Sequence, residues 1–152
     1  MMSDLKNRLA EEMKASMKNG NALKLSVIRM VRSAIKNKEI DRGKGAELDD
    51  AEVTEVIVSA VKQRNDSIEQ FSAGKRDDLV AKEKAEIEIL QTFLPRPFTD
   101  EEVRALILTT ISEAGAAGIK DMGKVMKVLM PKILGKADSA AASRMVKEFL
   151  AS

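Results

Sequence analysis

Lysines near the end of the chain are spaced so that several of them could share one surface. Lys120, Lys124 and Lys127 follow i, i+4 and i+7 spacing, which places them on one face of a predicted helix. The cations assigned to this surface are Lys120, Lys124, Lys127, Lys132, Lys136 and Arg144. Because lysine and arginine neutralise phosphates, the surface could bind RNA; plain solvation of a helix face is the alternative.

The other side of this predicted helix is apolar and rich in methionine, which usually fills a core. Its members are Met122, Val125, Met126, Leu129 and Met130. The whole chain has four Phe and neither Trp nor Tyr, and no aromatic residue is interleaved with the lysines. Stacking on single-stranded bases is therefore disfavoured, and recognition of phosphates and of RNA shape remains.

A second row of cations lies in the front half, within a helix predicted over residues 22–39. Arg29, Arg32 and Lys36 lie beside the apolar face of that helix and could make a second contact with an anion. Residues 1–47 hold 11 basic and 6 acidic residues, whereas residues 48–94 hold 6 and 11. A solvated face, or pairing with acids of the third and fourth helices, is therefore the alternative to anion binding.

Catalysis by this chain alone is not expected. It contains neither His nor Cys, so the usual base near neutral pH and any thiol nucleophile are missing. Acidic pairs such as Asp77 and Asp78 follow no calcium-loop spacing. We predict no catalytic residues, no metal site and no cofactor.

The elements that must position both rows are helices. Few aromatic residues, with many Ala, Leu, Met, Glu and Lys, favour an all-α fold. The first helix follows Ser3 and stops at Gly20, and the second packs against it as an antiparallel pair. A capping box at Asp49 and Glu52 opens the third, which ends at Gly74. The fourth covers residues 77–93.

Two prolines, at residues 95 and 97, interrupt the helical pattern and mark a domain boundary. A capping box at Thr99 and Glu102 then opens a helix that ends at Gly115. A short helix over residues 121–130 stops at Pro131, and a last one follows Asp138. The predicted domains are a four-helix domain over residues 1–94 and a three-helix domain over residues 95–152.

Short segments of the chain resemble the GatB/YqeY family. The tail segments KDMGKVM (120–126), LMPK (129–132) and GKAD (135–138) are similar to the tail domain of GatB. The segments LSVIRMVRSAIK (25–36) and LQTFLP (90–95) resemble the YqeY family. GatB is the tRNA-binding subunit of the glutamine-dependent aspartyl/glutamyl-tRNA amidotransferase. The resemblance implies a helical YqeY-type front domain, a GatB-type tail that helps to hold tRNA, and no catalytic domain.

The residues and the resemblance together predict a non-catalytic module that binds structured RNA, tRNA above all. One alternative is an accessory component of a glutamine-dependent tRNA amidotransferase, a carbon–nitrogen ligase with glutamine as amido-N-donor. Another is a protein–protein adaptor. An amidotransferase or synthetase protein is a further candidate partner.

The cellular setting is predicted from what the chain lacks. No apolar run approaches the roughly 18 residues that cross a bilayer, and the first residues have no signal-peptide core. We therefore expect a cytoplasmic protein without a membrane partner, and the resemblance to the GatB/YqeY family implies that it is of bacterial type.

Overall fold

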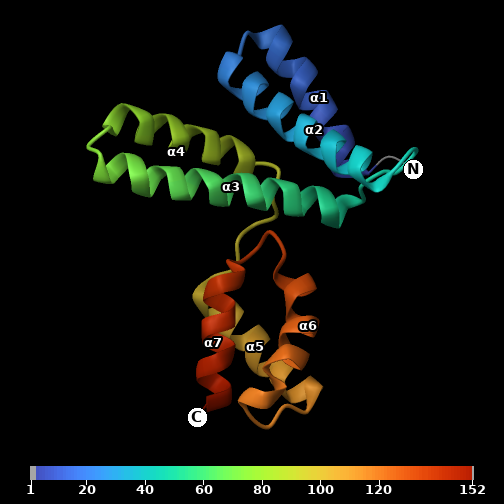
Figure 1. Cartoon of the computed structure of the whole chain (residues 1–152), viewed down its shortest axis with the longest axis vertical. Helices are drawn as coiled ribbons and strands as arrows, with labels where there is room; N and C mark the ends of the chain where they lie inside the picture. Colours follow the sequence, from blue (N-terminus) through green and yellow to red (C-terminus); the bar gives the residue numbers. More distant parts are fainter. Residues whose placement is uncertain (1–2, 152) are drawn as a thin grey trace. The chain divides into compact units, whose positions relative to one another are not determined.

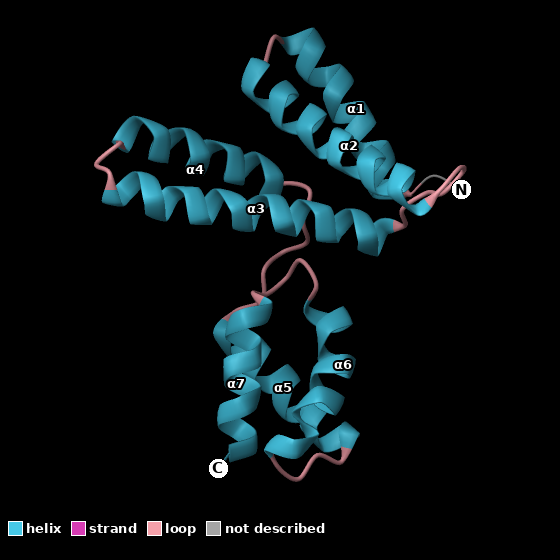
Figure 2. Ribbon diagram, in the orientation of Figure 1, coloured by secondary structure: helices cyan, strands magenta, loops and turns pink. Residues whose placement is uncertain are grey.

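The computed structural model describes residues 3–151, and this part of the chain is all-α, as predicted. It contains seven α-helices and one short 3₁₀ helix, and no strand is found among the described residues (Figures 1 and 2). The chain divides into two compact units, the first ending at Leu94 and the second beginning at Pro95. Each unit has its own apolar core.

Unit 1 consists of two helical hairpins (Figure 1). Its helices are α1 (Asp4–Asn19), α2 (Ala22–Arg42), α3 (Asp50–Ala73) and α4 (Asp77–Gln91). α1 and α2 lie side by side in opposite directions, as their short connection predicts. Gly20 makes this turn possible with a φ of 70°, and the N–H of Asn21 donates to the carbonyl of Ser16.

Side-chain caps fix where two of these helices begin. The Ser3 hydroxyl accepts a hydrogen bond from the Lys6 N–H at 3.0 Å. At the start of α3, Asp49 accepts from the Glu52 N–H at 2.9 Å, and the Glu52 carboxylate accepts in return from the Asp49 N–H at 3.2 Å. Such caps satisfy amides that have no partner inside the helix.

The core of unit 1 joins all four of its helices. Leu9 of α1, Ile28 of α2, Ile57 of α3 and Leu90 of α4 are each at most 1% exposed. Burial of their apolar surface is the main force that holds the two hairpins together.

Unit 2 is a smaller three-helix body with its own core. It contains α5 (Asp100–Ala114), the 3₁₀ helix η1 (Ile119–Asp121), α6 (Met122–Ile133) and α7 (Ser139–Ala151). Thr99 and Glu102 form the predicted capping box that begins α5. The buried core residues are Val103, Ile107, Val125, Leu129, Ile133, Ala142, Val146 and Leu150.

Three helix ends differ from the sequence prediction. α2 continues past residue 39 to Arg42, which pairs with Glu52 of α3. α4 ends at Gln91, so that Phe93 lies beyond the helix and is buried in the core. α6 runs through Pro131 to Ile133. Proline removes one helical hydrogen bond, but burial of Ile133, which is 1% exposed, favours the extra turn.

Candidate functional site

The first candidate site is the outer face of α6. Val125 and Leu129 of this helix are buried in the core of unit 2, whereas Lys124 and Lys127 are exposed. The i, i+3 spacing makes the two lysines neighbours on the helix surface. Among residues 3–151, no carboxylate forms an ion pair with either lysine. Their charges are therefore available to an external anion.

Lys120 lies outside the α-helix that carries Lys124 and Lys127. It lies in η1, where the N–H of Asp121 bonds to the carbonyl of Gly118 at 2.9 Å. Lys120 is exposed next to the start of α6, but i, i+4 spacing has no meaning across this tighter turn. Within α6 itself, the predicted face contains Lys124 and Lys127.

Asp121 lies close enough to Lys120 and Lys124 for their charges to act on it, and it has a structural role of its own. Its carboxylate accepts a hydrogen bond from the Ala117 N–H at 2.9 Å. That bond, helped by the charges of Lys120 and Lys124, lowers the pKa of Asp121 below its ordinary value. The carboxylate therefore stays ionised and holds the loop that precedes α6.

The remaining tail cations are placed differently. Lys132 lies 3.4 Å from the carboxylate of Glu113, and both side chains are largely exposed. The ammonium of Lys136 lies 5.1 Å from the ring centre of Phe98, which is a cation–π distance. Arg144 is exposed on α7. Lys132 and Lys136 thus have intramolecular contacts, whereas Lys120, Lys124, Lys127 and Arg144 form no ion pair with another described residue.

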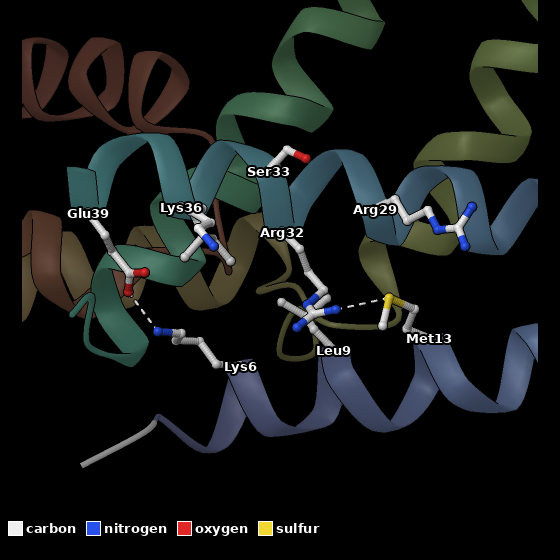
Figure 3. A pocket seen from close by; sticks show the side chains of 9 residues that line it. Lys6, Leu9, Met13, Arg29, Arg32, Ser33, Lys36 and Glu39 are labelled. Atoms are coloured by element: carbon white, nitrogen blue, oxygen red, sulfur yellow. Dashed lines mark hydrogen bonds and ion pairs between the residues drawn. The ribbon is translucent and has the colours of Figure 1, made fainter. Parts of the chain in front are cut away.

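The second candidate site is a groove between α1 and α2 (Figure 3). It is open, has a volume of about 600 Å³, and is bordered by the predicted cations Arg29, Arg32 and Lys36. All three are exposed, and none forms an ion pair with an acid of α3 or α4. The alternative in which those acids neutralise the row does not describe this structure. The guanidinium of Arg32 instead donates to the sulfur of Met13 at 3.0 Å.

An ion pair lies at one end of the groove (Figure 3). The Lys6 ammonium lies 2.6 Å from the Glu39 carboxylate, which also accepts from the Leu48 N–H at 2.9 Å. The hydrogen bond from Lys6, followed by that from Leu48, lowers the pKa of Glu39 despite its partial burial. Lys6 and Glu39 therefore neutralise each other within the groove wall.

Sequence reasoning did not assign six of the groove-lining residues to this site, among them Ser33 and Ile35 of α2. Lys6, Leu9 and Met13 come from α1, and Glu39 comes from the last turns of α2. The predicted antiparallel pairing of α1 and α2 could have indicated these residues. When the face of α1 that carries Leu9 and Met13 packs against α2, it comes to lie beside the cationic row.

Comparison with known proteins places the whole chain in one family. Residues 6–150 match the family described as Yqey-like protein. The chain belongs to the YqeY-like family. Its relatives include a Saccharomyces cerevisiae protein that is 33% identical over 150 residues, which cover 93% of this chain and 80% of that one. A Kluyveromyces lactis protein is 36% identical over 148 residues with the same coverage. A Candida glabrata protein is 42% identical over 86 residues, or 57% of this chain and 47% of that one.

These relatives correct two predictions. All three YqeY-like relatives carry the name altered inheritance of mitochondria protein 41, mitochondrial. The prediction of a bacterial-type protein is contradicted, because these relatives are yeast proteins. The prediction of a cytoplasmic protein is contradicted as well, because their names assign them to mitochondria. Within the described residues, no helix is long and apolar enough to span a membrane.

Proposed function

We propose that this YqeY-like protein is a non-catalytic module that binds structured RNA, tRNA above all, through the outer face of α6. One observation carries the proposal: Lys124 and Lys127 are exposed side by side, opposite the core and without an ion pair to any described residue. Lys120 and Arg144 add exposed positive charge to the same unit. Lys132 and Lys136 extend this surface when a phosphate replaces their contacts with Glu113 and Phe98.

The shape of this face favours the phosphate backbone over the bases. Lys124 and Lys127 extend from a helix surface, and the Phe98 ring is half-buried beside Lys136. Without an exposed aromatic ring, unpaired bases have nothing to stack on. Contact with the phosphates of a folded RNA needs only correctly spaced cations, and its affinity is mostly electrostatic.

The likeness of residues 120–138 to the GatB tail supports a second candidate, an accessory role in a glutamine-dependent tRNA amidotransferase. In that role unit 2 acts as a GatB-type tail that holds the tRNA body, while a separate protein carries out the ligase chemistry. Amidation rates of misacylated tRNA by a complete amidotransferase, with and without this protein, distinguish the two. If the protein binds tRNA but does not change the amidation rate, the result supports the RNA-binding module and not the accessory role.

Filter binding of labelled total tRNA tests the proposed function. Wild type is compared with Lys124→Ala/Lys127→Ala and with a control, Lys82→Ala/Lys84→Ala, that removes the same charge from two exposed positions on α4. We expect the α6 variant to bind several-fold more weakly and the control to bind like wild type. Absence of tRNA binding by wild type at low salt, or equal loss in both variants, would refute the proposal.

A further inference from the structure

The groove between α1 and α2 points to a different ligand. We infer that it binds an acidic, amphipathic segment of a partner protein, with apolar side chains against the groove floor and carboxylates on the α2 cations. This inference goes beyond RNA binding by α6 and concerns other residues of the chain.

The groove combines a cationic wall with an apolar floor. Arg29, Arg32 and Lys36 follow i, i+3 and i+7 spacing along α2 and span about 10 Å of helix. The half-buried Met13 of α1 lines the same hollow, together with the nearly fully buried Leu9 and Ile35. An amphipathic helix of a partner protein presents its side chains with the same i, i+3 and i+7 spacing. Its carboxylates can therefore contact the α2 cations on successive turns while its apolar side chains contact the groove floor.

The charges in the groove do not cancel. Lys6 and Glu39 form a pair, so the net positive charge comes from the three cations of α2. In Figure 3, Arg32 extends from α2 towards α1, where it meets the sulfur of Met13. A thioether is a weak acceptor compared with a carboxylate, so an incoming Asp or Glu can replace it with a stronger contact.

The floor favours a protein ligand over RNA. Phosphates gain nothing from apolar surface, whereas leucine-like side chains of a peptide would cover the half-buried Met13 and the aliphatic stems of Arg29 and Arg32, and so remove that surface from water. A second hollow of about 290 Å³ shares Lys36 and Glu39 with the groove and includes Ile40. Ile40 is 64% exposed, so the apolar surface continues past the end of the groove. A peptide longer than the groove therefore has a place to bury one more apolar residue.

The test uses a short fluorescein-labelled synthetic peptide that is designed to form an amphipathic helix. It places Leu at i, i+3, i+4 and i+7 and Glu at the flanking positions. A second peptide replaces each Leu by Ser and keeps every Glu. Fluorescence anisotropy measures binding to wild type, to Arg29→Glu/Arg32→Glu, and to Lys82→Glu/Lys84→Glu. The last variant carries the same charge change on exposed positions of α4.

We expect wild type and the α4 variant to bind the Leu–Glu peptide with equal affinity. Charge reversal at Arg29 and Arg32 should weaken binding by on the order of tenfold or more, because like charges then face each other. The Ser peptide should also bind at least several-fold more weakly. Absence of peptide binding to wild type, equal binding to all three proteins, or equal binding of the two peptides would overturn the inference. So would loss of tRNA binding on reversal at Arg29 and Arg32 with no effect on the peptide.

Discussion

The two cationic rows of this protein share a spacing and differ in their surroundings. Arg29 and Arg32 on α2 and Lys124 and Lys127 on α6 are each i, i+3 pairs of exposed side chains without an ion pair to a described residue. The α2 pair borders a hollow with an apolar floor, whereas the α6 pair lies opposite the core. Sequence spacing is enough to place cations in a row, but the ligand that we propose for each row depends on whether a neighbouring helix adds apolar surface beside it.

The units also differ in how they hold charge. Arg64 and Glu86 in unit 1 are both nearly buried, and their Nε and Oε2 atoms lie 3.4 Å apart. In unit 2, the buried polar side chain among the described residues is Thr110, which donates to the carbonyl of Leu106 at 2.7 Å. Unit 1 therefore contains a buried charge pair in addition to its apolar core, whereas unit 2 contains none among the described residues.

The largest effect should come from breaking the buried pair. Glu86→Ala leaves the buried Arg64 charge without an anionic partner, although Arg64 still donates to the Ala60 carbonyl, and breaking such a pair typically costs about 3–5 kcal/mol of unfolding free energy. Urea unfolding followed by circular dichroism measures this loss. Asp78→Ala removes an exposed partner of Arg76 and should cost much less. Equal losses in both variants would show that the Arg64–Glu86 pair is not a special requirement of unit 1.

The next effect separates the two cores. Leu129→Ala opens a cavity in unit 2 and should lower its stability by about 2–5 kcal/mol. Amide hydrogen exchange should then accelerate in α6, and tRNA binding should decline as α6 becomes unfolded. Ile28→Ala opens a comparable cavity in the core of unit 1, on the helix that carries Arg29 and Arg32, and should reduce peptide binding more than tRNA binding. The reverse pattern would contradict the assignment of the two ligands to the two units.

A smaller effect concerns the ion pair at the end of the groove. Because the folded-state pKa of Glu39 is lowered, its contribution is present above the ordinary value of 4.5 and is lost as pH falls through the lowered value. Glu39→Gln should cost up to about 1.5–3 kcal/mol near neutral pH, since hydrogen bonds to charged groups are of that size. It should also reduce the acid-induced loss of stability. Unfolding free energies measured from pH 7 to pH 3 check both points, and an unchanged pH dependence would contradict the role of Glu39.

Much of the fold was predictable because its signals are local. Ser3, Asp49 and Thr99 begin helices through hydrogen bonds to nearby amides, and Gly20 ends one through its positive φ. The boundary at Pro131 was wrong because it depends on a distant contact, the burial of Ile133 in the core of unit 2.

The candidate sites were predictable only in part, for the same reason. The i, i+3 pairs on α2 and α6 could be found within single helices. The groove could not, because Leu9 and Met13 become part of it only when α1 packs against α2. The 3₁₀ turn at Lys120 and the contact of Lys136 with Phe98 also depend on structure outside one α-helix.

The salt dependence of tRNA binding compares the two rows directly. Filter binding at several salt concentrations gives the slope of log affinity against log salt for wild type, Lys124→Ala/Lys127→Ala and Arg29→Ala/Arg32→Ala. Each lost phosphate contact should reduce the slope by about 1 unit, so the α6 variant should flatten it by about 2 units. The α2 variant should keep the wild-type slope and affinity. If the α2 variant flattens the slope of log affinity against log salt and the α6 variant leaves it unchanged, the assignment of RNA to the outer face of α6 is contradicted.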